Sequence, residues 1–390
     1  MLCLWRELKS EIRALKEKNL YRSLTAVSAG RSPAMAGRLL DFSSNDYLGF
    51  STHPSVVKKA AEALRFWGAG SGASRLISGN LQIHMDLEKA LARFKKEETA
   101  AVFSSGYLAN LGAVTALLGE EDVVLIDRLN HASLVDAARL SKAKLWVYPH
   151  RDVQALEQLL ARAGRFRRRL VATDAYFSMD GDVAPLDRLL EVCEQRDAIL
   201  MIDEAHSTGV FGATGRGLTE HFGLSGKIPI VMGTLSKALG SVGGFVCGNL
   251  PLKETLINRC RQFIYTTAPV PAASAAAMES LRMIEEETDT IGLRKTFWDN
   301  IHFLRSSLKE FGFDLMESEG PIVPILIGNT KKTLALRDYL RKEGIWAPAI
   351  RPPTVPKGAS RLRLSVLATH SRSQLMSFVR IMKKAKERLR

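Results

Sequence analysis

The segment Ile199-Leu200-Met201-Ile202-Asp203-Glu204-Ala205-His206 joins a short apolar run to two acids and a histidine. Four consecutive apolar residues predict a strand that is buried on both faces. Further apolar runs of strand length occur at 100–103, 123–126, 145–148, 170–173 and 230–232. Between these runs lie helix-like stretches, at 131–141, 152–162 and 185–196. Apolar strands that alternate with helices favour an α/β fold with a mainly parallel central sheet.

Working outward from this region, we expect three parts. Residues 50–285 form a large domain around the sheet. Residues 286–390 form a smaller C-terminal α+β domain, with helices at 290–311 and 331–343, strands at 322–327 and 361–367, and a last helix from about 372. Residues 1–49 form an N-terminal helical arm and short strands, because apolar residues recur at helical spacing from Leu4 to Leu20.

Composition excludes several classes of protein. The 390 residues are 46% hydrophobic and 25% charged, which excludes wholesale disorder, collagen and a coiled coil. Apolar runs stay far below the roughly 18 residues of a membrane span. Charges interrupt the first residues, and the four cysteines form no CxxC pair, so we expect a cytoplasmic protein without a secretion signal, zinc ribbon or disulfide scaffold.

The net charge of +14 fits two kinds of partner, nucleic acid or small polyanionic ligands. The densest basic run, Arg165-Phe166-Arg167-Arg168-Arg169, separates a helical stretch from an apolar run. A solvated loop is the ordinary interpretation of such a run. The charge pattern therefore leaves the partner open.

Reactive side chains follow three of the expected strands. Ligands of an open parallel sheet bind at the carboxyl ends of its strands. Asp203 and His206 follow one strand, Lys237 follows the strand at 230–232, and Ser104–Asn110 leads from a strand into a helix. Each has an ordinary alternative: a capping acid, a surface lysine or a plain helix start. No HExxH pattern gathers metal ligands, so we expect no metal site.

These parts together match the needs of pyridoxal phosphate (PLP). A desolvated lysine can form a Schiff base with a carbonyl. Free backbone N–H groups at a helix start bind phosphate, and an acid can face the pyridine nitrogen. The segment Asn130-His131-Ala132-Ser133 offers an imidazole, His131, to stack on the ring.

At this point the chain resembles the α-oxoamine synthases, PLP enzymes of aminotransferase fold type I. The resemblance spans nearly the whole chain and rests on these segments: 42–49 (FSSNDYLG), 70–75 (GSGASR), 105–107 (SGY), 130–133 (NHAS), 177–182 (FSMDGD), 203–206 (DEAH) and 234–237 (TLSK). Segments 350–356 and 361–364 are most similar to the members that join L-alanine to a pimeloyl thioester in biotin biosynthesis. A sibling activity such as glycine C-acetyltransferase is the alternative.

The resemblance also implies the role of each cofactor residue. Lys237 holds PLP and acts as the general base, and Asp203 faces the pyridine nitrogen. His206 and Ser178 lie near the phenolic oxygen, and His131 stacks on the ring and assists the thioester carbonyl. The phosphate is held by Gly106, Tyr107, Thr234 and Ser236, and by Thr266 or Thr267 of a neighbouring subunit. The expected assembly is therefore a homodimer with shared active sites.

Substrate contacts are implied in the same way. Asn45 and Arg361 would bind the amino acid carboxylate, and Arg22 and Thr354 are further substrate contacts. Arg363 is the rival of Arg361, on the expectation of an edge strand that turns one arginine to each face. The acyl donor is carried by coenzyme A or by acyl carrier protein. Because coenzyme A is a polyanion, the positive charge needs neither nucleic acid nor a membrane as partner.

Overall fold

The structure is a computed structural model that describes residues 2–24, 26, 39–286 and 292–389. It divides into two compact units, each considered by itself. The large unit comprises Asp46–Ser178 and Asp182–Arg294, and the small unit comprises Met1–Asn45, Met179–Gly181 and Lys295–Arg390. The domain boundaries expected at 49/50 and 285/286 stay a prediction.

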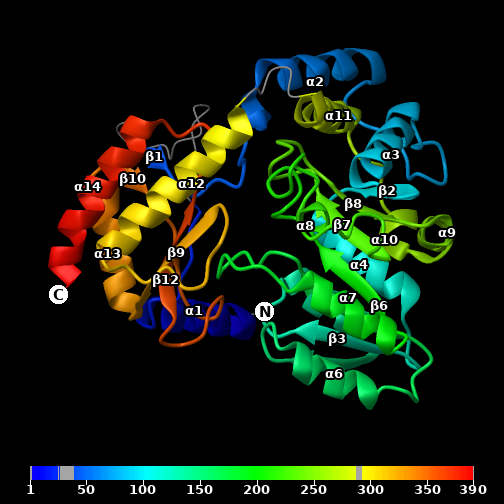
Figure 1. Ribbon diagram of the computed structural model, residues 1–390, viewed down its shortest axis with the longest axis horizontal. Helices are drawn as coiled ribbons and strands as arrows, with labels where there is room; N and C mark the ends of the chain where they lie inside the picture. Colours follow the sequence, from blue (N-terminus) through cyan, green and yellow to red (C-terminus); the bar gives the residue numbers. More distant parts are fainter. Residues whose placement is uncertain (1, 25, 27–38, 287–291, 390) are drawn as a thin grey trace. The chain divides into compact units, whose positions relative to one another are not determined.

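A seven-stranded sheet organises the large unit (Figure 1). Its strand order is β2 (Thr99–Phe103), β8 (Gly244–Gly248), β7 (Ile230–Thr234), β6 (Ile199–Asp203), β5 (Arg169–Asp174), β3 (Val123–Asp127) and β4 (Lys144–Tyr148). The strands from β7 to β4 pair in parallel, whereas β8 is antiparallel to β7 and to β2. The expected α/β fold with a mainly parallel sheet is confirmed.

Strand β8 was missed because its sequence, Gly-Phe-Val-Cys-Gly, begins and ends with glycine. Glycine is normally depleted in strands. At Gly244 a Cβ atom would lie 2.6 Å from the backbone of Gly106, so close packing requires glycine there. The strand is fixed by this tertiary contact, which the local sequence pattern does not reveal.

Helices connect the parallel strands and pack on the sheet. They are α4 (Gly106–Leu117), α5 (Ala132–Leu140), α6 (Val153–Ala161), α7 (Leu186–Gln195) and α8 (Leu218–His221). The unit also contains η1 (Phe50–Thr52), α2 (Pro54–Trp67), α3 (Gln82–Lys95), α9 (Leu250–Arg259), α10 (Arg261–Ile264) and α11 (Pro271–Glu286). All five residues of β3, β7 and β8 are buried. Both faces of the sheet are therefore covered, as the continuous apolar runs predict.

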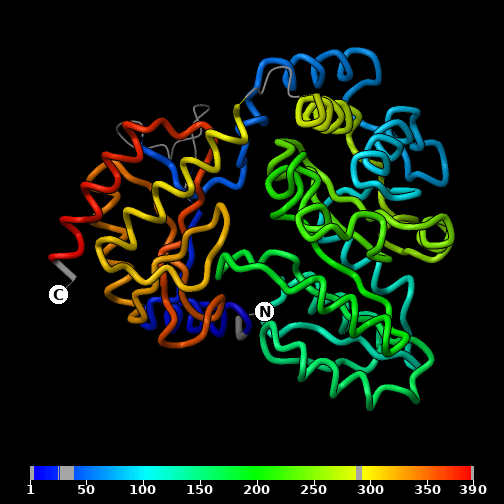
Figure 2. The backbone as a smooth tube through the Cα atoms, viewed as in Figure 1, coloured from blue at the N-terminus to red at the C-terminus, as the bar shows by residue number. Residues whose placement is uncertain are grey.

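The described residues of the small unit form two short sheets and four helices, whose backbone can be followed in Figure 2. Its elements are α1 (Leu2–Glu17), β1 (Leu40–Asp41), β9 (Ile322–Gly328), α13 (Thr330–Lys342), β10 (Ile345–Trp346), β11 (Ala349–Ile350), β12 (Ser360–Ser365) and α14 (Arg372–Leu389), with most of α12 (Leu293–Glu310). Phe378 of α14 packs on Phe42, with ring centroids 4.4 Å apart. The start expected for α12, at residue 290, lies outside the described residues.

One expectation about this unit was wrong. Strand β12 is not an edge strand, because it lies between β11 and β9. Side chains alternate along a strand, so Arg361 and Arg363, two residues apart, share one face. The argument that they point to opposite faces fails, and the choice of Arg361 rests on the family resemblance alone.

None of the helices described is both long and apolar enough to cross a membrane.

Candidate active site

A cavity of about 250 Å³ opens at the carboxyl ends of the central strands of the large unit. Nine of the predicted site residues line it: Gly106, Tyr107, His131, Ser178, Asp203, His206, Thr234, Ser236 and Lys237. Its remaining walls come from Ser105, Asn110, Ser133, Asp174, Tyr176, Ala205 and Met232. The three loops singled out in the sequence therefore meet in one cavity, because β2, β6 and β7, which precede them, run in the same direction and end at the same edge of the sheet.

One wall of the cavity is suited to an anion. Ser105 caps α4, and its side chain accepts a hydrogen bond from the Leu108 N–H at 3.2 Å. The first N–H groups of this twelve-residue helix point out of its N-terminus, where anions bind. A Cβ at Gly106 would lie 3.4 Å from Thr234 Oγ1, so glycine keeps the approach open. Thr234 and Ser236 place two hydroxyl groups beside it, 2.8 Å apart.

The buried acid Asp203 is linked to His131 through two residues that the sequence analysis did not single out. Asn110 donates from Nδ2 to Asp203 Oδ2 at 2.7 Å and to Ser133 Oγ at 2.8 Å. The Ser133 hydroxyl in turn lies 2.7 Å from His131 Nδ1. Both linking residues belong to motifs quoted above, but their contact depends on how α4 packs on α5. The chain of hydrogen bonds fixes the acid and the imidazole relative to each other.

His131 is held as a neutral imidazole. It caps α5, with Nδ1 accepting from the Ser133 N–H at 3.3 Å. Burial lowers the pKa of His131; Asp203 opposes this shift and Lys237 adds to it. The proton of the neutral ring therefore resides on Nε2, because Nδ1 acts as an acceptor.

Asp174, at the end of β5, is a second carboxyl group in the cavity. It pairs in register with Asp203 on the neighbouring strand, and its Oδ2 accepts from the His131 N–H at 2.9 Å. Its Oδ1 is buried without a hydrogen-bond partner. Burial and the adjacent Asp203 raise the pKa of Asp174 well above its ordinary value. Two anionic carboxylates side by side are unfavourable, so Asp174 is the one that retains a proton.

His206 is positioned by a contact from outside the sheet. Its Nδ1 lies 2.7 Å from the hydroxyl of Tyr47, which is fully buried. The tyrosine belongs to the quoted segment 42–49, yet its sequence gives no indication of a partner 159 residues away. Glu204, next to Asp203, is instead paired with Lys95, and both side chains are inaccessible to solvent. Asp203 is thus the acid of this pair that faces the cavity.

The predicted substrate residues lie in the small unit and are described there. Arg22 donates to Thr354 Oγ1 at 2.9 Å. Arg361 is buried and pairs with Asp180 at 2.8 Å, whereas Asn45 Oδ1 accepts from Arg363 at 3.2 Å. Asn45 is therefore bonded to Arg363, and Arg22 is bonded to Thr354. Arg361 instead donates to Met179 and Asp180 in the loop at 179–181.

Thr266 and Thr267 do not line the cavity of their own chain. Thr267 is exposed and forms a β-bridge with Ser74. Ser71 Oγ donates to the Pro269 carbonyl at 2.6 Å, so the segments 70–75 and 266–270 are joined.

The residues of the cavity fit PLP. The helix start at Gly106 with the hydroxyls of Thr234 and Ser236 suits a phosphate, Lys237 supplies an amine, and Asp203 supplies a carboxylate for a pyridine nitrogen. The buried and unpaired Oδ1 atoms of Asn110 and Asp174 mark polarity that a bound group would complement. Among the described residues, no group of three or more His, Cys, Asp or Glu side chains is placed to hold a metal ion.

Comparisons with known proteins agree with this geometry. Residues 38–381 match the family model described as aminotransferase class I and II. The chain is 46% identical to an 8-amino-7-oxononanoate synthase of Geobacter sulfurreducens, with 95% of each chain covered. It is 39% identical to 8-amino-7-oxononanoate synthase 1 of Bacillus subtilis, covering 98% of this chain and 97% of that one.

Solved structures extend the agreement to the fold. Serine palmitoyltransferase of Sphingomonas wittichii superposes with a TM-score of 0.91 at 31% identity, covering 100% of this chain and 98% of that one. The 8-amino-7-oxononanoate synthase of Francisella tularensis gives 0.78 at 29% identity, over 90% and 98% of the two chains. The chain therefore belongs to the aminotransferase class I and II family and, within it, to the 8-amino-7-oxononanoate synthases.

Proposed function

We propose that this protein catalyses the decarboxylative condensation of L-alanine with a pimeloyl thioester, the step that gives 8-amino-7-oxononanoate in biotin biosynthesis. The observation that carries the proposal is the meeting of Lys237, Asp203 and His131 in one cavity beside an anion-binding helix start. The identity of 46% to a synthase of this name supports the substrate assignment. PLP is the cofactor of the family, and when bound it supplies an electron sink for the carbanion.

Lys237 is proposed as both the covalent anchor and the general base. It follows β7 directly and lines the cavity. A lysine amine that is neutral at working pH can remove the α-proton of L-alanine, a contribution of about 10²–10⁴-fold for general-base catalysis.

Asp203 is proposed to stabilise a proton on the pyridine nitrogen. Its Oδ2 accepts from Asn110 and its Oδ1 from the Ala205 N–H at 2.8 Å. These two bonds fix the orientation of the Asp203 carboxylate at the cavity wall. His131 would then present a neutral ring face, while His206 and Ser178 would bond the phenolic oxygen.

Arg361 is proposed to bind the carboxylate of L-alanine, together with Asn45. A guanidinium can hold a carboxylate through two parallel hydrogen bonds. Arg361 already pairs with an acid, Asp180, so it would have to release or share that partner. Substitution by lysine removes the two-pronged geometry, and we expect Arg361→Lys to raise KM for alanine about 10-fold, the equivalent of one charged hydrogen bond.

The rival arginine provides the matched control. Arg363→Lys should leave KM for alanine within about twofold of the wild-type value if Arg361 is the contact. A larger rise in KM for Arg363→Lys than for Arg361→Lys would reverse the assignment.

Arg22 and Thr354 are proposed as contacts of the acyl donor. They bond each other in an exposed part of the small unit, which suits a long substrate that extends toward solvent. The donor is a thioester of coenzyme A or of acyl carrier protein. Both carriers are acidic, and the charge of +14 would attract either, with a dependence on ionic strength.

We further propose a homodimer in which Thr266 or Thr267 reaches the partner's phosphate site. Large apolar side chains of the large unit are strongly exposed, including Phe66 at 78%, Ile77 at 80% and Tyr265 at 72%. Such residues are typical of protein interfaces. Ile77→Glu should yield monomers in analytical ultracentrifugation, whereas Val147→Glu, on the edge strand β4, should remain dimeric.

A cytoplasmic location is proposed as well. Cys193, Cys247 and Cys260 are buried free thiols. Burial raises the pKa of Cys193 to about 12 and that of Cys260 to about 11, so both stay protonated at neutral pH. Reduced thiols are the normal state in a reducing compartment.

The deciding experiment offers purified enzyme alanine or glycine with a panel of acyl thioesters and measures release of the carrier thiol. We expect alanine with the pimeloyl thioester to give the highest kcat/KM. Preference for glycine would assign a sibling activity such as glycine C-acetyltransferase. Borohydride reduction followed by peptide mapping should place PLP on Lys237, and a label on another residue would refute the assignment of the anchor.

A further inference from the structure

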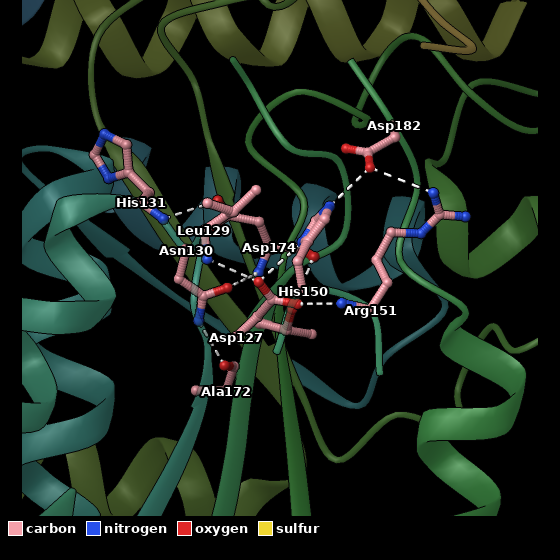
Figure 3. Close-up of polar contacts among 10 residues, drawn as sticks. Asp127, Leu129, Asn130, His131, His150, Arg151, Ala172, Asp174 and Asp182 are labelled. Carbon is pink, nitrogen blue, oxygen red and sulfur yellow. Dashed lines mark hydrogen bonds and ion pairs between the residues drawn. The ribbon is translucent and has the colours of Figure 1, made fainter. Parts of the chain in front are cut away.

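His150 lies between Asp127, which precedes the loop to His131, and Asp182, at the end of a second loop (Figure 3). It follows β4 in the turn that ends with Arg151, and it does not line the cavity. One loop leads from β3 to His131, and the other leads from β5 to Ser178 and Asp182. Figure 3 shows the His131 side chain directed away from His150, so any influence must pass through the backbone.

Both ring nitrogens of His150 bond a carboxylate. Nδ1 lies 3.0 Å from Asp127 Oδ1, and Nε2 lies 2.8 Å from Asp182 Oδ2. The side chain of His150 is 24% exposed, whereas those of Asp127 and Asp182 are 1% and 6% exposed. Ionised carboxylates only accept hydrogen bonds, so both nitrogens must donate. The ring is therefore an imidazolium between two anions.

Asp127 builds the turn that leads to His131. Its Oδ1 accepts from the Leu129 N–H at 2.8 Å, and its Oδ2 accepts from the Arg151 N–H at 2.8 Å. Its backbone carbonyl accepts from the Asn130 N–H at 3.2 Å. Loss of the cation beside Asp127 would leave a buried carboxylate without a charged partner and would loosen this turn.

The turn is coupled to the cavity through Asn130 and Asp174. Asn130 Oδ1 accepts from the Asp174 N–H at 3.1 Å, and its Nδ2 donates to the Ala172 carbonyl at 2.7 Å. The His131 N–H donates to Asp174 Oδ2 at 2.9 Å. A shift of the turn would therefore move the His131 ring relative to the sheet.

Asp182 provides the matching link to the second loop. The Phe177 N–H donates to the Asp182 carbonyl at 3.0 Å, which closes the loop that contains Ser178. The His150 ring also packs edge-on against Phe177, with centroids 4.5 Å apart. One imidazolium thus holds both loops.

We propose that His150 is a positioning residue of this active site, an imidazolium that ties the His131 turn to the Ser178 loop through Asp127 and Asp182. The kinetic test of this proposal rests on the proposed function. A second test, which measures the protonation of the His150 ring, is independent of that function.

The charged groups around His150 set the pH range of this link. Burial lowers the pKa of His150, but hydrogen bonds and charge from Asp127 and Asp182 outweigh burial and raise it to about 9. Arg151, which also bonds Asp182 at 3.3 Å, adds a like charge nearby. Because the folded pKa lies above the ordinary 6.5, the link is complete below pH 6.5 and is lost as the pH rises through about 9.

Two variants separate the two halves of the link. The amide nitrogen of His150→Asn can replace Nδ1 and bond Asp127, and that of His150→Gln can replace Nε2 and bond Asp182. We expect each holoenzyme to lose about 10- to 100-fold in kcat, the scale of a displacement near 1 Å, with KM for alanine within about threefold. Wild-type kcat is expected to fall as the pH rises through about 9, and this fall should be absent from both variants. His302→Gln, an exposed histidine of α12, should be unchanged.

The independent readout needs no turnover. In protein labelled with [15N]histidine, the His150 ring, assigned by its absence in His150→Gln, should show both nitrogens protonated at pH 7 and titrate near pH 9. A ring that is neutral at pH 7 would overturn the proposal, whatever the activity of the variants. Variants with wild-type kcat and pH profile would overturn it as well. Inactive wild-type enzyme with an imidazolium at His150 would count against the proposed function instead.

Discussion

Buried carboxyl groups at the two ends of the central sheet differ in how completely they are hydrogen-bonded. At the amino end, Asp122 accepts from Arg167 at 3.0 and 2.8 Å, from Arg168 N–H at 3.1 Å and from Gly119 N–H at 2.8 Å. At the carboxyl end, Asp174 keeps one buried oxygen without a partner. The first arrangement satisfies its acid completely, and the second leaves polarity for a ligand to complete.

The pKa directions follow the same division. Burial alone would raise the pKa of Asp122, but Arg167 and the two backbone N–H groups lower it below the ordinary 3.8. The pKa of Asp174 is raised by burial and by Asp203. The comparison teaches that burial of an acid does not by itself identify a functional site, and that the unpaired oxygen of Asp174 is informative because Asp174 lines the cavity.

The largest expected effect comes from Asp203→Asn, which removes the charge of the functional end. A preorganised charge of this kind is worth about 10²–10³-fold in kcat. Steady-state kinetics should show this loss, while the melting temperature changes little because the amide retains the size of the side chain. Wild-type kcat in this variant would show that the carboxylate has no part in the reaction.

Asp122→Asn should change the stability of the protein and leave the reaction rate unchanged. Loss of the charged acceptor should lower the free energy of unfolding by about 1–3 kcal/mol at pH 7, with kcat unchanged. The pKa of Asp122 is depressed, so its stabilisation is present above the ordinary value and disappears as the pH falls below it. Urea titrations should therefore separate wild type from variant at pH 7, and the difference should shrink as the pH falls below 3.8. A loss of kcat with intact stability would contradict the division between the two ends.

Asp174→Asn should stabilise the protein slightly. A raised pKa means that the folded state loses stability as the pH rises from 3.8 toward the folded pKa, because the unfolded chain ionises first. We expect the cofactor-free variant to melt no lower than wild type at pH 7.5, with a weaker pH dependence, and kcat to fall less than tenfold. Marked destabilisation at pH 7.5 would mean that the carboxylate is ionised and paired.

The smallest effect is expected for Arg167→Met. The Arg167 side chain is 52% exposed, and surface ion pairs contribute about 0–1 kcal/mol. Thermal unfolding at low salt should show that the variant is slightly less stable than the wild type. High salt should make this difference smaller, because salt screens the ion pair that only the wild type contains. A loss as large as that of Asp122→Asn would mean that the guanidinium, more than the backbone donors, satisfies the acid.

Much of the fold followed from local patterns. The parallel strands and three of their connecting helices, α5, α6 and α7, were predicted within one or two residues. Continuous apolar runs are distinctive of buried strands. Strand β8 was missed because glycine at both ends conceals it, and β12 was wrongly taken for an edge strand. The local sequence of a strand does not show which strands pair with it on either side.

The basic run 165–169 illustrates the same limit. The expected solvated loop is present, with Arg165 and Arg167 exposed. The structure adds partners that the charge pattern does not reveal: Arg167 pairs with Asp122, Arg168 bonds the Leu117 carbonyl at 2.5 Å and Arg169 pairs with Asp197. These partners lie 28 to 51 residues away in the chain. Charge patterning gave the position of the cations, and packing gave their role.

By itself the sequence determined the strand–helix alternation, the position of Lys237, Asp203 and His131 at strand ends, and the resemblance to a PLP family, because each depends on residues close together in the chain. Tertiary structure decided that Asn110 and Ser133 join Asp203 to His131, that Tyr47 bonds His206, and that His150 holds two loops. Hydrogen bonds of that kind depend on strand register and helix packing, which bring distant residues within about 3 Å, and periodicity carries no information at that scale.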